Sequence, residues 1–333
     1  MKAKTRFFYL IVLVFFIQTV IVSVAAAATR IMPLGDSITF GNDSGIGNPD
    51  FVTSYRKALW EKLIAAGYDV DFVGSEEAGE LIAPPFDNDN AGFPGIKDDD
   101  MVTLLNSGYN PHSGIQVTPN PYLEDYPADI ILLHIGTAGL DDDFSGYVED
   151  ILDEIDTYET ASGNEVWVIL ALIINRSCIT DTPPCPLSAT TTDLNDNVLF
   201  MARNRISAGD KIVIVDMENG AGMDYRLFGD GGDMNNDLHP YQAGLGYAKM
   251  ADVWFSALEQ ILTDPDPDPS DNSSTSDSGC FIGTAAYGLH MEPHAKAPGG
   301  FRDYFLHNTF AGRTFVDLYH SIRHLRVIST TSL

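Results

Sequence analysis

A serine that follows a short apolar run is the strongest candidate for chemistry in this sequence. The run Ile31–Leu34 ends in Gly35-Asp36-Ser37, and polar residues and glycines follow at once. This pattern is typical of a buried strand that breaks into a turn. If a helical turn begins at Ser37, its own backbone N–H points towards the oxygen of a bound ester. Ser37 is therefore our candidate nucleophile for acyl transfer.

A serine nucleophile also needs a general base and donors for the oxyanion, and later segments offer both. Gly95 closes the stretch Asn90-Ala-Gly-Phe-Pro-Gly95, where a bare backbone N–H can come close to a substrate. His239 lies just before the last predicted helix and is the natural base. We therefore predict a site with Ser37 and His239 as catalytic residues, and with the N–H groups of Ser37 and Gly95 as oxyanion donors.

The elements around these residues alternate between strand and helix patterns. Apolar or alternating runs predict strands near residues 31–35, 68–73, 129–135, 166–174 and 212–215, and helical periodicity fills the segments between and after them. Such alternation predicts an α/β fold, a three-layer α/β/α sandwich with a five-stranded parallel sheet. A flavodoxin-like order of 2-1-3-4-5 would place Ser37 at the carboxyl edge, near a switch point. Residues 76–126 are irregular in pattern, which favours a functional loop or a small subdomain.

Composition limits the partners and cofactors of the chain. Its 333 residues include 47 acidic and 19 basic side chains, which give a formal charge of −28. Such a charge argues against nucleic-acid binding and against docking on an anionic membrane. No cysteine and histidine spacing resembles a zinc site, and the acidic run at residues 230–237 lacks the spacing of an EF-hand. We expect no metal and no cofactor.

Four segments differ in composition. Residues 1–28 combine a basic start, an apolar middle and small residues at the end, which predicts a secretory signal peptide; an uncleaved anchor is the alternative. Residues 29–263 form the predicted main domain. Residues 264–279 are rich in proline, acid and serine, so they predict a solvated linker. Residues 280–333 form a small C-terminal module. No segment after residue 28 is long and apolar enough to span a bilayer.

Taken together and in order, the motifs of the main domain resemble the SGNH/GDSL hydrolase superfamily, and within it the acetylxylan-esterase-like branch of carbohydrate esterase family 3. The resemblance covers roughly residues 30–262. It is carried by the nucleophile block Ile31–Thr39, the glycine block Gly92-Phe-Pro-Gly95, the third block Leu132–Thr137, and His239-Pro240 in the last block. The resemblance implies an SGNH hydrolase fold and a serine esterase that forms an acyl-enzyme on Ser37 with His239 as base.

Two departures from the family pattern bear on activity. The family's third block has an asparagine that donates to the oxyanion, and this chain has Ala138 there. The family places an aspartate three residues before its histidine, and this chain has Asn236 there and Asp237 one step later. We predict that Asp237 orients His239 and that Asn236 is a turn residue. If Asn236 is the orienter instead, the site has lost its carboxylate.

The C-terminal module also carries a resemblance. Cys280–Gly288 is similar to the CFI box of exported bacterial proteins, with Gly283 in place of the usual alanine. Its position after a linker implies sorting or cell-envelope attachment, although a small packed accessory helix fits equally. The expected location is secreted, periplasmic or at the cell envelope.

Two enzymatic functions and one non-enzymatic function are compatible with these observations. The leading hypothesis is an exported esterase that deacetylates polysaccharide or a small ester. The second is a lysophospholipase-like esterase acting on lipid or aryl esters. The third is a catalytically impaired carbohydrate-binding or envelope protein on the same scaffold. A shallow, aromatic-rimmed cleft would favour sugar, and a deep apolar cleft would favour acyl chains.

The cysteines provide a first testable prediction. Cys178 and Cys185 flank a short proline-containing loop, so in an exported chain we predict that they form a disulfide and that Cys280 stays outside the pair. Closing so small a ring is worth roughly 2–3 kcal/mol in the chain-entropy model. Mass spectrometry of unreduced peptides should show the linkage, and Cys280 joined to either residue would refute it.

Overall fold

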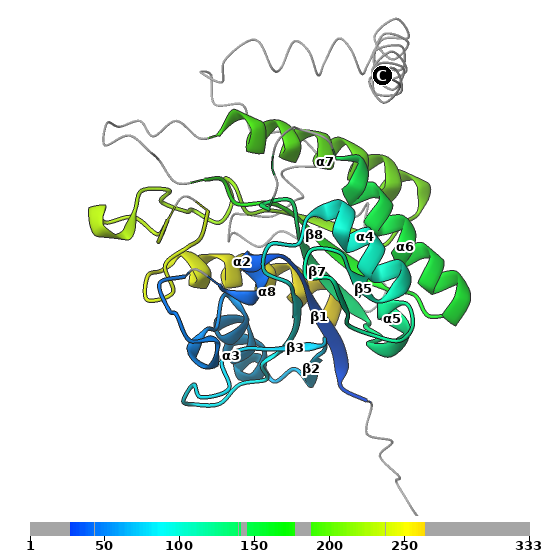
Figure 1. Cartoon of the computed structure of the whole chain (residues 1–333), viewed down its shortest axis with the longest axis horizontal. Helices are drawn as coiled ribbons and strands as arrows, with labels where there is room; N and C mark the ends of the chain where they lie inside the picture. Colours follow the sequence, from blue (N-terminus) through cyan, green and yellow to red (C-terminus); the bar gives the residue numbers. More distant parts are fainter. Residues whose placement is uncertain are drawn as a thin grey trace, which may run out of the picture. The chain divides into compact units, whose positions relative to one another are not determined.

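A computed structural model shows the predicted three-layer α/β/α sandwich (Figure 1). It describes residues 27–42, 44–138, 140, 145–176, 188–236 and 238–263. The strands of the central sheet are β1 (Thr29–Gly35), β2 (Val70–Phe72), β3 (Glu76–Glu77), β4 (Asp89–Gly92), β7 (Ile130–His134), β8 (Trp167–Leu172) and β9 (Ile212–Asp216).

The parallel part of the sheet follows the predicted order. β1 pairs with β7, and β8 and β9 follow outward on that side, all parallel. On its other side, β1 pairs with β2 along its first residues and with β4 along its last. The described sheet therefore has seven strands and not five, because β2 and β4 share one position and β3 adds an antiparallel pairing to β4. The direction of progression reverses between β1 and β7, which places a switch point beside Ser37.

Two apolar cores cover the two faces of the sheet. Ile130 and Leu132 of β7 face one core, and Ile131 and Leu133 face the other, as the two-residue period of a strand requires. One face is covered by α3 (Arg56–Ala66) and α8 (Gly246–Thr263), and the other by α4 (Asp98–Ser107), α5 (Tyr122–Asp125), α6 (Gly146–Ser162) and α7 (Ala189–Ala208) (Figure 1).

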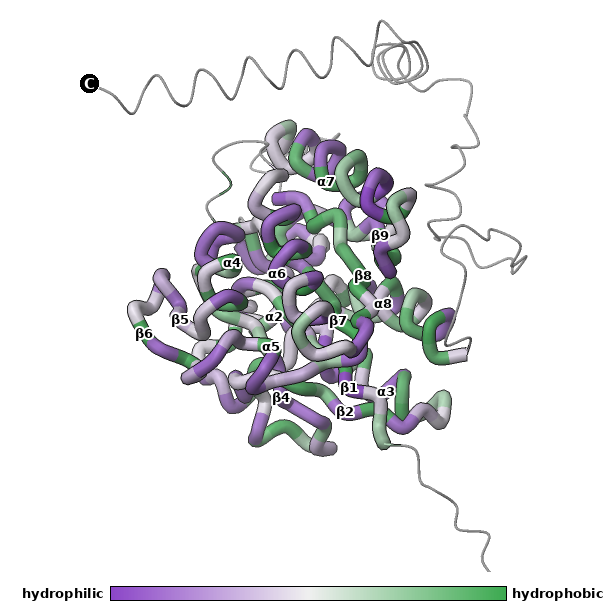
Figure 2. The backbone as a smooth tube through the Cα atoms, turned by 90° about the vertical axis from the view of Figure 1, so that its right-hand side faces the viewer, coloured by the Kyte–Doolittle hydropathy of each residue, from purple (hydrophilic) through white to green (hydrophobic). Residues whose placement is uncertain are grey.

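Hydropathy follows this layering. In Figure 2 most of β8 is coloured hydrophobic, whereas α6 and α7 alternate between hydrophilic and hydrophobic residues. All six residues of β8 are buried. The continuous apolar runs at β7 and β8 are thus explained by helices on both faces of a parallel sheet.

Residues 76–126 contain more regular structure than their pattern indicates. Besides β3, β4, α4 and α5, they form a small hairpin of β5 (Tyr109–Asn110) and β6 (Ile115–Gln116). These elements are short, and glycines in the left-handed region end or join several of them. The segment is a folded addition to the sandwich and not a long loop.

Several sequence predictions fall on residues outside the described ranges. These are the signal peptide up to residue 26, Cys178 and Cys185, Asp237, the linker and the C-terminal module. Each stays a prediction. Within the described ranges, every helix is too short or too polar to cross a lipid bilayer.

The nucleophile segment forms α2 (Ser37–Phe40), a single helical turn between the sheet and α3. Arg56 of α3 is fully buried, and its guanidinium donates to the carbonyls of Thr39 (3.1 Å) and Phe40 (3.1 Å) at the end of α2. It also donates to the carbonyls of Ala78 and Asn88. Burial lowers the pKa of Arg56 to about 10, so the group remains charged at neutral pH and fixes the end of α2.

Replacing Arg56 should therefore destabilise the whole domain. Arg56→Ala leaves buried carbonyls without donors and should lower the free energy of unfolding by about 3–5 kcal/mol. The adjacent Lys57 forms only an exposed ion pair with Glu61, so Lys57→Ala should change it by less than about 1 kcal/mol. Urea denaturation of both variants tests this, and equal losses would contradict the proposed role of Arg56.

Candidate active site

Ser37 and His239 meet at the carboxyl edge of the sheet. Ser37 is the first residue of α2, directly after the end of β1, and His239 lies in the loop between β9 and α8. Ser37 Oγ is 2.8 Å from His239 Nε2. Both residues are nearly buried, with 8% and 6% of their surface exposed. The pairing of nucleophile and base predicted from the sequence is thus present in the geometry.

The loop that carries His239 is held by backbone hydrogen bonds. The Asn235 N–H donates to the His239 carbonyl at 2.7 Å, and Met234 and Pro240 form an isolated bridge. Asp233, at the base of the loop, accepts from the Tyr241 N–H through its carbonyl and forms an ion pair with Lys249 of α8 at 2.6 Å. The loop that carries the general base His239 is therefore tied to the last helix, α8, through Asp233.

Asn236 faces the second ring nitrogen of His239. Its Oδ1 lies 3.1 Å from His239 Nδ1 and also accepts from the backbone N–H groups of Leu238 and His239, each at 2.9 Å. These two donors fix the amide with its oxygen towards the ring, because its NH₂ group could not accept from them. An oxygen at this position selects the tautomer with hydrogen on Nδ1, so Nε2 is free to accept the Ser37 proton. Asp237, our predicted orienter, lies outside the described residues.

Two backbone N–H groups are available for an oxyanion. Within the described part of the chain, the N–H groups of Ser37 and Gly95 donate to no other group. Gly95 follows Pro94 in a turn closed by a bond from the Ile96 N–H to the Phe93 carbonyl, and its φ of 83° favours glycine. The Phe93 N–H donates to the Gly35 carbonyl at 2.9 Å, which holds this turn beside the start of α2.

Asp36 joins the nucleophile turn to the loop after β7. Its Oδ1 accepts from the Ile38 N–H at 2.9 Å and caps α2, and its Oδ2 accepts from the Thr137 N–H at 3.2 Å. The side chain is fully buried, and this burial raises the pKa of Asp36 to about 6 despite the backbone N–H groups of Ile38, Thr137 and Ala138, which lower it. Thr137 precedes Ala138, whose methyl group offers no donor. Asp36 was not singled out by sequence reasoning, although its place before Ser37 suits a helix cap.

The histidine within the third motif block, His134, does not join this site. His134 is fully buried at the end of β7, and burial lowers its pKa to about 4, so it stays neutral as a core residue. Among the described residues, no group of three histidine, cysteine or acidic side chains is arranged to hold a metal ion.

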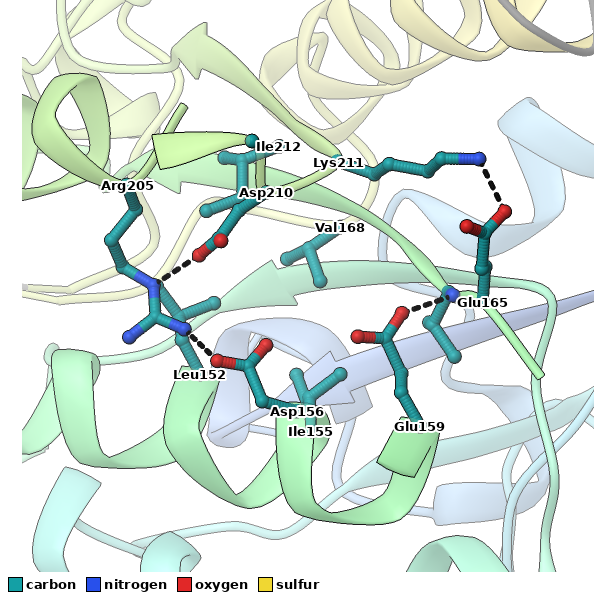
Figure 3. Close-up of a pocket in the computed structure, with 12 residues that line it drawn as sticks. Leu152, Ile155, Asp156, Glu159, Glu165, Val168, Arg205, Asp210, Lys211 and Ile212 are labelled. Atoms are coloured by element: carbon teal, nitrogen blue, oxygen red, sulfur yellow. Dashed lines mark hydrogen bonds and ion pairs between the residues drawn. The ribbon is translucent and has the colours of Figure 1, made fainter. Parts of the chain in front are cut away.

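A small cavity lies at the other edge of the sheet (Figure 3). Its lining includes Val168 and Ile212, at the starts of β8 and β9, and Arg205 of α7. Arg205 forms ion pairs with Asp153, Asp156 and Asp210. Figure 3 also shows Lys211 paired with Glu165. These paired charges join helices to strand starts at the edge opposite Ser37, so the cavity is separate from the site.

The fold matches solved esterase structures. A carbohydrate esterase family 3 protein from Talaromyces cellulolyticus is 22% identical, with a TM-score of 0.53, and the match covers 71% of this chain and 99% of that chain. A family 3 carbohydrate esterase from Clostridium thermocellum is 23% identical, with a TM-score of 0.50, over 72% of this chain and all of that chain. At these identities the likeness confirms the fold implied by the sequence motifs.

Sequence comparison gives a shorter match. A multidomain esterase from Ruminococcus flavefaciens is 37% identical over 126 residues, which is 34% of this chain. The match spans only 15% of the length of that esterase. No protein-family model matches the chain.

The buried carboxyl of Asp36 predicts a specific pH dependence of stability. Because its pKa is raised in the folded state, from 3.8 to about 6, the folded protein binds the proton more tightly than the unfolded chain. The contribution of Asp36 to the free energy of unfolding is therefore largest below pH 4 and falls as pH rises to 6, by about 3 kcal/mol. Asp36→Asn removes this titration.

Urea denaturation of wild type and Asp36→Asn at several pH values between 4 and 7 measures the effect. Titrations of the other carboxyl groups cancel in the difference between the two proteins. The wild type should lose stability relative to the variant as pH rises through this window. A difference that does not change with pH would contradict the assignment.

Proposed function

We propose that this protein is a serine esterase that forms an acyl-enzyme on Ser37 with His239 as general base. The observation that carries the proposal is the 2.8 Å contact between Ser37 Oγ and His239 Nε2 at the carboxyl edge of the sheet. The unpaired N–H groups of Ser37 and Gly95 beside this contact support an oxyanion site. The esterase fold of the solved structures is compatible with the same activity.

The geometry supports a two-step mechanism. His239 Nε2 takes the Ser37 proton as Oγ attacks the ester carbonyl, and the Ser37 and Gly95 N–H groups bind the resulting oxyanion. His239 then gives its proton to the leaving alcohol, and an acyl group remains on Ser37. Water, activated by the same histidine, attacks this acyl-enzyme and releases the acid and free Ser37. Asn236 keeps the ring of His239 in the required tautomer throughout.

Two features lower the rate expected of this site. Asn236 is neutral, so it orients the imidazolium that forms during attack without stabilising its charge by a carboxylate. In Ser-His-Asp proteases the corresponding change from aspartate to asparagine costs ~10⁴ in rate, largely because the histidine takes the wrong tautomer. Asn236 Oδ1 holds the correct tautomer here, so ~10⁴ is an upper limit on its cost. Ala138 supplies no side-chain donor, and one oxyanion donor is worth ~10²–10³. Slow turnover is thus part of the proposal.

The proposed substrate is an acetylated polysaccharide or a small ester. Tyr241 lies two residues after His239 and packs against Phe228, with ring centroids 4.3 Å apart. Phe228 is 46% exposed. A packed aromatic pair with one exposed ring in the histidine loop suits a sugar ring better than an acyl chain. The sequence resemblance and the carbohydrate esterase matches support the same class. Rates on acetylated xylan, a lysophospholipid and aryl acetates with one preparation would separate the alternatives.

Export belongs to the proposal as well. The signal peptide predicted at residues 1–28 supports a secreted or periplasmic protein, and the resemblance of the C-terminal module supports attachment to the cell envelope. Cell fractionation with an antibody to residues of the main domain tests both. Recovery of the chain in the cytoplasm alone would contradict them.

The role of Ser37 is directly testable. Ser37→Ala should abolish hydrolysis of an aryl acetate and labelling by a serine-directed phosphonate, with a melting temperature within a few degrees of wild type. Ser113→Ala, an exposed serine in the loop between β5 and β6, is the control and should keep both properties. A wild-type protein that is neither labelled nor active would favour the silent carbohydrate-binding alternative.

The partner of His239 gives a second test of the mechanism. Because Asn236 Oδ1 faces Nδ1, Asn236→Asp should place a carboxylate there and raise kcat by ~10² or more, up to the ~10⁴ seen in triad hydrolases. Asp237→Ala tests the prediction made from the sequence. A large loss with Asp237→Ala and no effect of Asn236→Asp would assign the role to Asp237. A gain with Asn236→Asp and little loss with Asp237→Ala would assign it to Asn236.

A further inference from the structure

The hairpin of β5 and β6 brings a histidine against the oxyanion turn. His112 lies in the loop between the two strands and is exposed. A methyl group added to Gly95 would lie 2.4 Å from His112 Nε2 and 2.7 Å from Cε1. The nitrogen-bearing edge of the imidazole therefore rests directly against the Cα of Gly95.

The hairpin itself fixes where this histidine sits. Asn110 is 4% exposed, and its carbonyl accepts from the Gly114 N–H at 2.9 Å. Its side-chain Oδ1 accepts from the Ser113 N–H at 3.2 Å. The buried Asn110, before His112, is thus bonded to Ser113 and Gly114, after it. These bonds close the loop and limit the positions that the imidazole can take.

The neighbouring groups make a donor at this place useful. The turn that contains Gly95 is bonded through Phe93 to Gly35, two residues before Ser37. His112 therefore packs against the residue that carries one of the two proposed backbone donors. Ala138 leaves the proposed site with two backbone donors and no side-chain donor. Within the described residues, the ring nitrogens of His112 make no hydrogen bond, so one of them can serve an incoming group.

We propose that His112 supplies the side-chain donor to the oxyanion that Ala138 cannot supply. This inference rests on the proposed esterase function. When Ser37 attacks, the ester carbonyl oxygen becomes an oxyanion that accepts from the N–H groups of Ser37 and Gly95 and from the His112 Nε2–H. No proton is transferred to or from His112. Its contribution is a hydrogen bond that strengthens as the charge develops, which raises kcat more than it lowers KM.

Steady-state kinetics on an aryl acetate test this role. His112→Ala should lower kcat by ~10²-fold with KM nearly unchanged, because the lost bond forms in the transition state. Inhibition by phenylboronic acid, whose adduct on serine is tetrahedral, should weaken to a similar extent. Ser113→Ala, the adjacent exposed residue, is the matched control and should change neither value.

Adding the missing amide gives the sharper test. Ala138→Asn should restore much of the activity lost in His112→Ala, and should raise the activity of the otherwise unchanged protein less. This non-additivity is what two donors serving one oxygen would produce. A merely structural role of His112 would not be rescued by a substitution in the loop after β7. Circular dichroism melting confirms that the variants are folded.

The outcomes separate this inference from the esterase proposal. An active wild type with His112→Ala within twofold of it overturns the role of His112 and leaves the esterase intact. Loss of activity in His112→Ala without rescue by Ala138→Asn, and with phenylboronic acid inhibition unchanged, also overturns it. An inactive wild type, or an active Ser37→Ala, overturns both.

Discussion

The site depends on a helix too short to be stable alone. α2 has four residues, and isolated helices of that length do not form in water because nucleation costs more than one turn returns. Its geometry must be imposed from outside, and two buried charges do so. Asp36 caps its N-terminus and reaches the loop after β7, while the guanidinium of Arg56 collects the carbonyls at its C-terminus. The position of Ser37 is set between them.

This arrangement explains how a site with few charged groups can remain ordered. The two proposed backbone donors to the oxyanion belong to α2 and to the turn that contains Gly95. That turn is bonded to Gly35 through Phe93, so both donors depend on the residues that hold the start of α2. Gly35 itself admits no side chain, because a methyl group there would lie 2.1 Å from the His134 carbonyl oxygen. The ends of β1 and β7 are therefore in close backbone contact directly before the nucleophile turn. Loss of charge at Asn236 and of a donor at Ala138 leaves this framework intact.

The long-range order of the sheet was predictable because it follows from hydrophobic periodicity. The runs at the centres of β1, β7, β8 and β9 are apolar, and a parallel sheet with helices on both faces is the arrangement that buries such runs. Ser37 and His239 were predictable because each follows or precedes a strongly patterned element. The elements within residues 76–126 were not, since β3, β5 and β6 have two residues each and carry no periodicity. Contact between His112 and Gly95 arises from that segment and has no local sequence signal.

Asn236 shows a different limit. Sequence reasoning noted that it stands where the resembling family has aspartate, and preferred Asp237 because only a carboxylate stabilises an imidazolium. Which oxygen faces Nδ1 depends instead on the turn before His239, where the Leu238 and His239 N–H groups both bond to the residue at position 236. Backbone geometry of that kind is invisible to composition.

The direction of the last helix affects how the domain can be attached to other material. α8 starts beside the histidine loop, where Gly246 packs against Asp233 and Pro240, and it runs back so that Glu259 comes within electrostatic range of Tyr68, just before β2. β1 starts at the same far edge, where the Thr29 N–H bonds to the Asp69 carbonyl. Both ends of the domain thus emerge on the side away from Ser37. A tether at either one, whether a bead, an electrode or a second protein module, would leave the reactive edge facing an insoluble substrate.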